Sequence, residues 1–336
     1  MPNDIVAVDD GYAQIKVVGA NPDGSNKPIM LSIRSSIRHG SIGSVSGSGA
    51  IATYETDDGA TKMTVSDEVS GESTQFDGFH TSSMNRILIA HALVEAGYGG
   101  KDDINLWAGL PVANFFKNDE SASRNDEFIA QKIANLKIPV RSLVPGAAPC
   151  PRYTDVHIGC QALAAFIDYA VDDDFQDRQD VGLDRVAVVD IGGRTTDIAV
   201  VLGGQRCDPT ASKTRNIGVL DVQKDLARRI QKKFEVSDSY SADFLDKAVR
   251  TGVAKLWGQD FQVSDLVEEA KAATSQKLTN FLSEILGSAS NMDAVLFVGG
   301  GATLFEQSSK QFRNGKILDN PEFANARGLY KYAHLA

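Results

Sequence analysis

The chain has 336 residues, is 42% hydrophobic and carries a formal net charge of −10 at pH 7. That length exceeds one typical domain and can bury a large core, so we expect two domains. The acidic balance disfavours unaided binding to nucleic acid, because phosphate backbones attract basic surfaces. Cys150, Cys160 and Cys207 form no CxxC pair, which argues against a disulfide framework or a zinc site and fits a reducing cytoplasm.

The chain opens with a predicted strand and glycine turn. Residues 4–11 form an apolar stretch that ends in Asp9, Asp10 and Gly11, and a second strand follows through Lys16. Backbone N–H groups in such a turn can bind an anion, and glycine lets the main chain approach phosphate oxygens closely. Lys16 can reach back to the same place as a point charge.

The next 100 residues predict a subdomain and the rest of a sheet. Residues 19–80 are rich in Gly and Ser, including the run 40–49, and indicate a small β-rich subdomain with mobile loops. Residues 85–96 then have the apolar spacing of a helix, and residues 103–111 are typical of a core strand with its exit turn.

The opening pattern returns in mid-chain. Residues 185–191 form an apolar strand that contains Asp190, and Gly192 and Gly193 follow before another strand. For one such hairpin alone, an ordinary hairpin with an acid at its turn is the favoured interpretation. Two of them, each opening half of the chain, favour a shared phosphate site. Carboxylates repel phosphate, so we expect Asp9 and Asp190 to hold a hydrated Mg²⁺ instead.

Helices dominate the second half of the sequence. Residues 171–184 are acidic and are interpreted as the crossing between halves, and residues 221–236 and 264–286 predict amphipathic helices. The first of these helices carries Lys232, a candidate ribose contact. A solvated charged face is the alternative that we favour for its lysines.

A third glycine turn lies near the C-terminus. Residues 293–298 form an apolar strand, and Gly299, Gly300 and Gly301 follow before a helix predicted from Thr303. Three glycines cost backbone entropy on folding, so something must require them. A flat adenine ring packed on bare backbone is one such requirement, and a tight strand-to-helix turn is the other.

These motifs resemble the phosphate 1, phosphate 2 and adenosine motifs of the actin, Hsp70 and sugar-kinase superfamily. They are Asp9-Asp10-Gly11 with Lys16, Asp190-Ile191-Gly192-Gly193 with Thr195-Thr196-Asp197, and Val298-Gly299-Gly300-Gly301-Ala302. Within the superfamily, the double acid, the run 189–197 and the closing run 325–330 most resemble the ParM/StbA family of bacterial actin-like ATPases, which segregate plasmids. The motifs cover nearly the whole chain in the same order and spacing.

The resemblance implies a nucleotide site built from both halves. Gln161 matches the Gln or Glu that positions the water attacking the γ-phosphate, and Asp9 and Asp190 match the carboxylates that hold Mg²⁺ and complete the catalytic set. The implied nucleotide contacts are Asp10, Gly11, Tyr12, Ala13, Lys16, Gly192, Gly193, Arg194, Thr195, Thr196, Lys232, Gly299, Gly300, Gly301 and Ala302.

The sequence departs from the family pattern at a few positions. Cys160 stands before Gln161 where relatives often have Pro, and Tyr12 and Ala13 stand where relatives often have hydroxyl residues. Hydrogen bonds from this loop to phosphate must then come mostly from backbone N–H groups. Arg194 replaces a frequent Thr; it either approaches a phosphate or points to solvent, and we favour solvent.

The implied fold class is α/β, with two actin-like (ribonuclease H-like) domains around a nucleotide cleft, each with a smaller subdomain. We expect domain I over residues 1–170, with its subdomain at about 19–80, and a C-terminal helix at 311–336 that completes it. Domain II is expected over residues 171–310, with its subdomain at about 205–290. The helices at 161–170 and 325–332 connect the halves where they hinge.

The implied function is ATP hydrolysis with Mg²⁺ coupled to filament assembly. Subunits would join head to tail and move plasmid DNA through a DNA-binding adaptor, without direct nucleic-acid contact; GTP is the alternative nucleotide. No run of about 18 apolar residues occurs and the N-terminus leads almost directly into a strand, so we expect no membrane span, no secretory signal and a bacterial cytoplasmic location.

Three alternatives use the same fold. A small-molecule kinase needs an aspartate base beside the γ-phosphate, for which Asp9, Asp10, Asp190 and Asp197 are the candidates. Another bacterial actin-like cytoskeletal protein is the second alternative. An Hsp70-like regulator, the third, would need a peptide-binding domain, and the chain ends soon after the last nucleotide motif.

Overall fold

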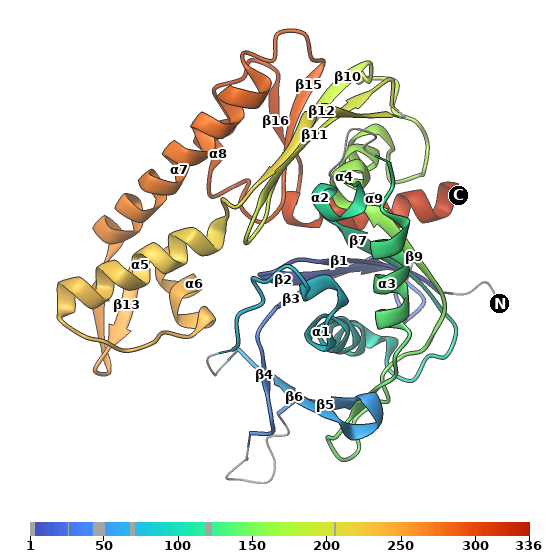
Figure 1. The fold of residues 1–336 in the computed structure, drawn as a ribbon, viewed down its shortest axis with the longest axis vertical. Helices are drawn as coiled ribbons and strands as arrows, with labels where there is room; N and C mark the ends of the chain where they lie inside the picture. Colours follow the sequence, from blue (N-terminus) through green and yellow to red (C-terminus); the bar gives the residue numbers. More distant parts are fainter. Residues whose placement is uncertain (1–3, 26, 43–50, 68–70, 118–122, 205) are drawn as a thin grey trace.

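Two five-stranded sheets with the same topology form the centre of the molecule (Figure 1). The computed structural model describes residues 4–25, 27–42, 51–67, 71–117, 123–204 and 206–336. The first sheet has the order β3-β2-β1-β7-β9 and the second has the order β12-β11-β10-β15-β16. In both sheets, three consecutive strands form an antiparallel meander. The first strand of the meander pairs in parallel with a later strand, and that strand pairs in parallel with the strand at the edge of the sheet. The predicted fold class is confirmed.

The strands of these sheets are short and mostly apolar. The first sheet contains β1 (Asp4–Asp10), β2 (Gln14–Gly19), β3 (Ile29–Arg34), β7 (Ile104–Leu110) and β9 (Tyr153–Cys160). The second contains β10 (Arg185–Ile191), β11 (Thr196–Leu202), β12 (Arg206–Arg215), β15 (Ala294–Val298) and β16 (Gly315–Ile317). The central strands β1, β10 and β15 are buried along nearly their whole length, which explains their continuous rather than alternating apolar sequence.

Two helices cross between the sheets and exchange places. Helix α4 (Gln161–Ala170) follows the first sheet but packs on the second, whereas α9 (Ala324–Leu335) follows the second sheet and packs on the first (Figure 1). The helices touch at Gly328, where a Cβ would lie 1.7 Å from the Ala164 carbonyl oxygen. Small residues therefore allow the backbones to meet, as the sequence predicted for the connecting helices.

Each half also carries a smaller part outside its five-stranded sheet. In the first half, β4 (Ile37–His39), β5 (Thr53–Thr56), β6 (Thr61–Val65) and β8 (Val140–Ser142) form a four-stranded sheet in the order β4-β6-β5-β8. The predicted β-rich subdomain at 19–80 thus includes a strand from far later in the chain. Residues 43–50, most of the predicted Gly/Ser-rich loop, lie outside the described residues.

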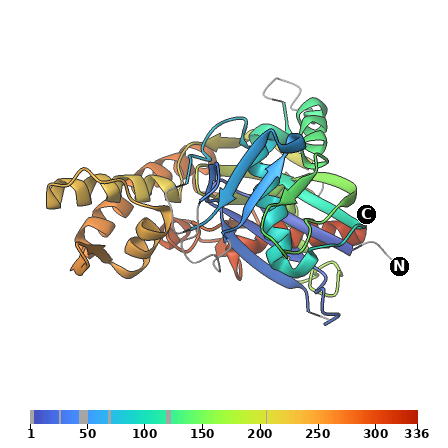
Figure 2. The same cartoon turned by 90° about the horizontal axis from the view of Figure 1, so that it is seen from below.

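Helices complete both halves. The first half contains α1 (Ser83–Leu93), α2 (Val112–Phe115), α3 (Asp126–Leu136), the 3₁₀ turns η1 (Asp57–Gly59) and η2 (Phe79–Thr81), and the π turn η3 (Val94–Tyr98). The second half contains α5 (Val219–Phe234), α6 (Ala242–Thr251), α7 (Ser264–Leu286), α8 (Glu306–Ser309), the 3₁₀ turn η4 (Pro321–Phe323) and the hairpin β13 (Val253–Leu256) to β14 (Gln259–Gln262). Figure 2 shows α5, α6 and this hairpin extending away from the sheets.

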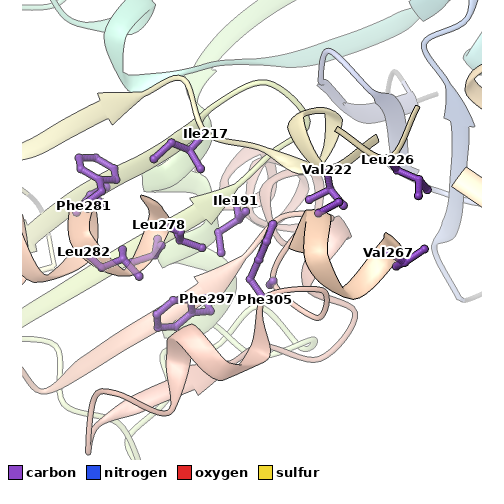
Figure 3. Close-up of a cluster of buried hydrophobic side chains, with 14 of the residues drawn as sticks. Ile191, Ile217, Val222, Leu226, Val267, Leu278, Phe281, Leu282, Phe297 and Phe305 are labelled. Atoms are coloured by element: carbon purple, nitrogen blue, oxygen red, sulfur yellow. The ribbon is translucent and has the colours of Figure 1, made fainter. Parts of the chain in front are cut away.

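The second half buries the larger hydrophobic core. Apolar faces of α5 and α7 meet the strands of the second sheet, as Figure 3 shows for Val222, Leu278, Phe281 and Phe297. The helices predicted at 221–236 and 264–286 are confirmed, as is the amphipathic spacing that buries these faces. Among the described residues, no helix combines the length and apolar character needed to cross a bilayer.

The C-terminal region departs from the sequence-based expectation. The predicted C-terminal helix at 311–336 is wrong in its start, because residues 315–317 form strand β16 and pair in parallel with β15. The helix begins only at Ala324, after the 3₁₀ turn that starts at Pro321. The helix predicted from Thr303 is likewise a turn, followed by the four-residue α8. The division into domains at residues 170 and 310 stays a proposal, with β16 assigned to the second half.

Candidate functional site

The two halves enclose a cavity of about 410 Å³, which we call the central cleft. Its lining includes most of the predicted site residues from both halves. These are Asp9, Gly11, Tyr12, Ala13, Lys16, Gln161, Asp190, Gly192, Gly193, Thr195, Gly299 and Gly300. Residues separated by nearly 300 positions in the sequence are therefore brought to one place.

Asp9 anchors the side of the cleft that belongs to the first half. It lies at the carboxyl end of β1, opposite Lys16 in the β1–β2 ladder, and Lys16 Nζ is 3.0 Å from Asp9 Oδ2. Gln161, the first residue of α4, donates from Nε2 to Asp9 Oδ1 at 2.7 Å. All three side chains are buried, so the acid, the cation and the amide form one fixed group.

Asp190 forms the matching group in the second half. Asn325, in the first turn of α9, donates from Nδ2 to Asp190 Oδ2 at 2.8 Å. Burial and then the negative charge of Asp9 raise the pKa of Asp190 to about 7. The charges of the two acids thus interact across the cleft. Each carboxylate also accepts a hydrogen bond from a side-chain amide at the start of a crossing helix.

This pair of acids fits a hydrated divalent cation. No group of three or more His, Cys, Asp or Glu side chains that could hold a metal occurs within the described part of the chain. Mg²⁺ is usually bound by one or two carboxylates together with phosphate oxygens and water, which matches a cleft with two facing acids. Asp9 and Asp190 are the residues that would hold it.

The helix starts add a favourable field for anions. Within the described residues, neither α4 nor α9 receives a side-chain hydrogen bond at its N-cap. The positive end of each helix dipole therefore lies near Gln161 or Asn325, which both line the cleft. This arrangement suits phosphate groups.

The two glycine hairpins touch each other. A Cβ on Gly193 would lie 2.5 Å from the Ala13 Cβ and 3.1 Å from its backbone nitrogen. In the second hairpin, Gly192 donates its N–H to the Thr195 carbonyl at 2.9 Å. Asp197 accepts from the hydroxyl of Thr195 at 2.9 Å, and burial raises the pKa of Asp197. The hairpins thus meet at the mouth through backbone and small side chains.

The glycine run 299–301 is required by the end of β10. A Cβ on Gly299, whose φ is +83°, would lie 2.3 Å from Asp190 Oδ1, and one on Gly301 would lie 2.4 Å from Ile191 Cγ2. Gly300 faces the cleft, and a Cβ there would meet only Gln14 Oε1 at 3.7 Å. The tight-turn interpretation therefore accounts for Gly299 and Gly301, and Gly300 offers the open backbone surface.

Several predicted contacts lie elsewhere. Asp10 points into the first half, Thr196 is buried with its hydroxyl donating to the Ile217 carbonyl, and Ala302 is fully buried. Lys232 is exposed at the C-terminal end of α5, about 12 Å along the helix from Lys224, which does line the cleft. Asp10, Thr196, Gly301, Ala302 and Lys232 are not among the residues that line the cleft, and their nucleotide contacts stay predictions.

Asp10 has a separate role because β1 alternates its side chains between two faces. Its carboxylate accepts from Lys132 Nζ at 2.7 and 2.8 Å and from Asn85 Nδ2 at 2.7 Å, and His80 Nδ1 lies 3.0 Å away. Burial opposes ionisation, but Lys132 and His80 together lower the pKa of Asp10 to about 2. Asp10 is thus a buried ion-pair partner.

Sequence reasoning missed other parts of the lining. Residues 71–75 lie along the cleft, and the Thr74 hydroxyl donates to the Tyr12 carbonyl at 2.5 Å. Gln14, Gln223 and Asn325 also line it. A signal existed only for Asn325, which stands in the first turn of the predicted hinge helix.

Polar contacts close the mouth of the cleft. Arg34 of β3 donates to Asp246 Oδ2 at 2.7 Å and to the Ala242 carbonyl at 3.1 Å, and it lies 3.5 Å from Asp243. Both acids and the carbonyl belong to α6 in the opposite half. We call this group the Arg34 latch.

Two more contacts span the same mouth. Arg194 pairs with Asp77 at 2.7 Å and lies over the Tyr12 ring at 5.2 Å from its centroid. Lys224 donates to Gln75 Oε1 at 2.7 Å. Arg194 therefore contacts the opposite half, a third outcome beside the phosphate and the solvent considered from the sequence.

Comparisons with known proteins agree with this geometry. Residues 5–148 match the family "Plasmid segregation protein ParM, N-terminal", and residues 188–311 match "Archaeal actin homologue MreB-like, C-terminal". Sequence comparison with curated proteins gives no match.

Solved structures resemble the whole chain. The archaeal actin homologue Ta0583 has a TM-score of 0.77 at 21% identity and covers 99% of this chain and 100% of its own. A ParM from a 15-stranded filament of Clostridium botulinum has a TM-score of 0.76 at 18% identity, with 100% of both chains covered. The actin-like protein Alp7A has a TM-score of 0.72 at 14% identity and covers 98% and 96%.

Two hairpin-bearing halves around a central cleft define an actin-like fold. The family matches from residue 5 to residue 311 are more specific. The first part of the chain is therefore similar to ParM, the second part is similar to the archaeal MreB-like actin homologue, and the whole chain shares the fold of solved actin-like proteins.

The buried acid Asp190 predicts a pH-dependent stability. Its folded pKa of about 7 lies above the ordinary value of 3.8, so its carboxyl stabilises the fold fully only below about pH 4 and loses this contribution as pH rises through 7. Without Mg²⁺ or nucleotide, Asp190→Asn should therefore gain roughly 2–4 kcal/mol relative to the native chain between pH 4 and pH 8. Urea unfolding at both pH values measures this. The exposed Asp102→Asn variant should show no such trend, and a flat Asp190→Asn difference would contradict the buried charge.

The Arg34 latch predicts a salt-dependent opening. Arg34→Ala removes a partly buried ion pair, so closure should weaken by about 1 kcal/mol, which raises the open population about fivefold. Small-angle X-ray scattering of the nucleotide-free protein at low salt should show a larger radius of gyration. High salt should bring the native chain toward the same value. Arg38→Ala, an exposed arginine on β4, is the matched control; equal scattering from all three proteins would contradict the latch.

Proposed function

We propose that the protein is an Mg²⁺-dependent ATPase that forms filaments and moves plasmid DNA through an adaptor protein. The observation that carries this proposal is the convergence of two glycine hairpins and two acids, Asp9 and Asp190, on one cleft between the halves. Two structurally similar proteins support this proposal. Ta0583 has been solved in complex with ADP, which supports nucleotide binding, and a ParM has been solved as a filament, which supports self-assembly.

The residues divide the work of hydrolysis between them. Backbone N–H groups of both hairpins bind the phosphates, and Lys16 contributes a positive charge beside Asp9. A bound Mg²⁺ supplies charge neutralisation at the phosphates, held by Asp9 and Asp190. Gln161 orients the attacking water, because its amide is fixed by Asp9 at the start of α4 and faces the cleft.

Nucleotide state would control the angle between the halves. A triphosphate that contacts both hairpins favours the closed form through its differential affinity for that form, and hydrolysis removes this bias. Head-to-tail contacts between identical subunits are heterologous and do not close, so assembly would give an open filament. The net charge of −10 favours a basic adaptor over direct DNA contact.

The kinase alternative has fewer candidate bases than the sequence offered. Asp10 is neutralised by Lys132, and Asp197 accepts hydrogen bonds from Thr195 and Thr214 at 2.9 and 2.5 Å. The other two candidates, Asp9 and Asp190, line the cleft, and both are the proposed metal ligands. We therefore favour the filament-forming ATPase.

A filament former should sediment in a nucleotide-dependent way. A non-hydrolysable ATP analogue with Mg²⁺ should lower the critical concentration, because it stabilises the closed subunit, while ADP should leave most protein in the supernatant. Sedimentation and electron microscopy at matched concentrations measure this. The Asp190→Ala variant, which lacks one proposed metal ligand, should stay in the supernatant with either nucleotide. A chain that stays monomeric with ATP yet phosphorylates a small molecule would be a kinase.

Gln161 should act on the chemical step. If it orients water only in the transition state, Gln161→Ala should lower kcat by about 100-fold or more and change ATP affinity by less than threefold. Filaments formed with ATP should then last longer. Steady-state hydrolysis and equilibrium nucleotide binding separate the two effects. Equal losses in affinity and kcat would give Gln161 a structural role instead.

A further inference from the structure

A phosphate site explains why Asp9 is acidic but does not explain the neighbouring Asp10. Asp9 faces the cleft and accepts from Gln161, but Asp10 faces the interior and is fully buried. Lys132 of α3 is also fully buried and forms the ion pair with Asp10. Burying such a pair is expensive, and apolar replacements are often at least as stable, so stability alone does not account for it.

Lys132 has a further partner on strand β7. Its Nζ donates to the Gly109 carbonyl at 2.5 Å, and Gly109 lies at the end of strand β7, next to β1. The ammonium therefore ties the end of β7 to the carboxylate on β1. This contact adds a side-chain hydrogen bond to the β7–β9 pairing that already holds the Gly109 backbone.

Gly109 in turn forms the surface on which Gln161 rests. A Cβ at this position would lie 2.6 Å from Gln161 Cγ and 3.3 Å from its Cδ. The backbone of Gly109 is that of an ordinary strand residue, so the glycine is needed for space rather than for conformation. The nearest atom is Cγ and not the far end of the side chain, so relieving the overlap would displace the carboxamide as well.

These contacts form a closed circuit. Gln161 bonds to Asp9, the neighbouring Asp10 pairs with Lys132, Lys132 holds the Gly109 carbonyl, and Gly109 packs against Gln161. Both acids thus restrain Gln161. Asp9 accepts a hydrogen bond from its amide, and Asp10 acts through Lys132 and Gly109, whose backbone packs against the Gln161 side chain.

We infer that Gly109, Lys132 and Asp10 are positioning residues that hold the Gln161 carboxamide in the orientation used for hydrolysis. The inference rests on the proposed ATPase function, which it deepens by assigning a role to three residues that do not touch nucleotide. It concerns the chemical step, because the circuit ends on the Gln161 side chain.

The first test is a single methyl group. Gly109→Ala should lower kcat for ATP about 10- to 100-fold, because a misplacement of about 1 Å can cost this much, while nucleotide affinity changes less than threefold. In a Gln161→Ala background the same substitution should have no further effect on kcat. A full additional loss in that background would overturn the inference.

The matched control is Gly159→Ala. Gly159 pairs with Gly109 in the neighbouring strand β9, but a Cβ there would meet Leu329 Cδ2 at 2.5 Å rather than Gln161. This variant should keep kcat within threefold even if it loses as much thermal stability. Equal losses of kcat in both variants would mean that overpacking of the sheet, and not the position of Gln161, decides activity.

A spectroscopic measurement tests the positioning without hydrolysis. In nucleotide-free protein labelled with ¹⁵N-glutamine, the side-chain amide signal that Gln161→Ala removes should shift or broaden in Gly109→Ala and stay in place in Gly159→Ala. An unchanged Gln161 signal in Gly109→Ala would overturn the inference, whatever the activity.

A charge-balanced variant covers the case in which Gly109→Ala does not fold. Asp10→Asn combined with Lys132→Met leaves no unpaired buried charge, so the fold should survive. It should reproduce the loss of kcat and the change in the Gln161 signal. Normal kcat in this variant would overturn the inference, and a wild-type chain without ATPase activity would instead overturn the proposed function.

Discussion

The contact between α4 and α9 is the constraint on which the cleft depends. Gly328 lies directly on the Ala164 carbonyl, so the helices cross at backbone distance and each covers the sheet of the other half. Because of this exchange, both helices start beside the cleft. Gln161 at the start of α4 then reaches Asp9, and Asn325 at the start of α9 reaches Asp190. The two acid–amide pairs are equivalent products of one repeated topology.

The two halves differ in the charge that surrounds each cleft acid. The cross-strand neighbour of Asp9 is Lys16, whereas the cross-strand neighbour of Asp190 is another acid, Asp197. One acid is therefore neutralised by its own hairpin, and burial and negative neighbours raise the pKa of the other. The second half is the side that gains most from an added cation, while the first half carries the positive charge that suits a phosphate.

Local sequence patterns predicted the parts of the site that are local in the chain. Both hairpins and strand β15 were predicted because apolar runs that end in acid or glycine leave few alternatives. Period-two alternation also implies that adjacent acids face opposite sides, so Asp10 could have been separated from Asp9 by the same rule. Likewise, helical spacing places Lys232 more than two turns from Lys224, the lysine of α5 that lines the cleft.

Contacts made by tertiary packing carried no such signal. The partner of Asp10 lies 122 residues away and that of Arg34 lies 212 residues away, so neither pair shares a local pattern. Strand β8 joins the small sheet from residue 140, and β16 consists of three residues whose sequence has no distinct strand signal. Each depends on where the larger elements pack, which a single sequence does not encode locally.

The strength of the mouth contacts suits a reversible closure. The pairs of Arg34 and Arg194 are partly exposed, and pairs of this kind contribute from a few tenths to about 1 kcal/mol each. Their sum biases the halves toward closure without fixing them. A ligand shifts a two-state equilibrium by its differential affinity, and a change from mostly open to mostly closed requires only a few kcal/mol. Because the contacts at the mouth are weak, a ligand bound between Asp9 and Asp190 can decide whether the halves are open or closed. A stronger salt-bridge network would keep them closed without a ligand.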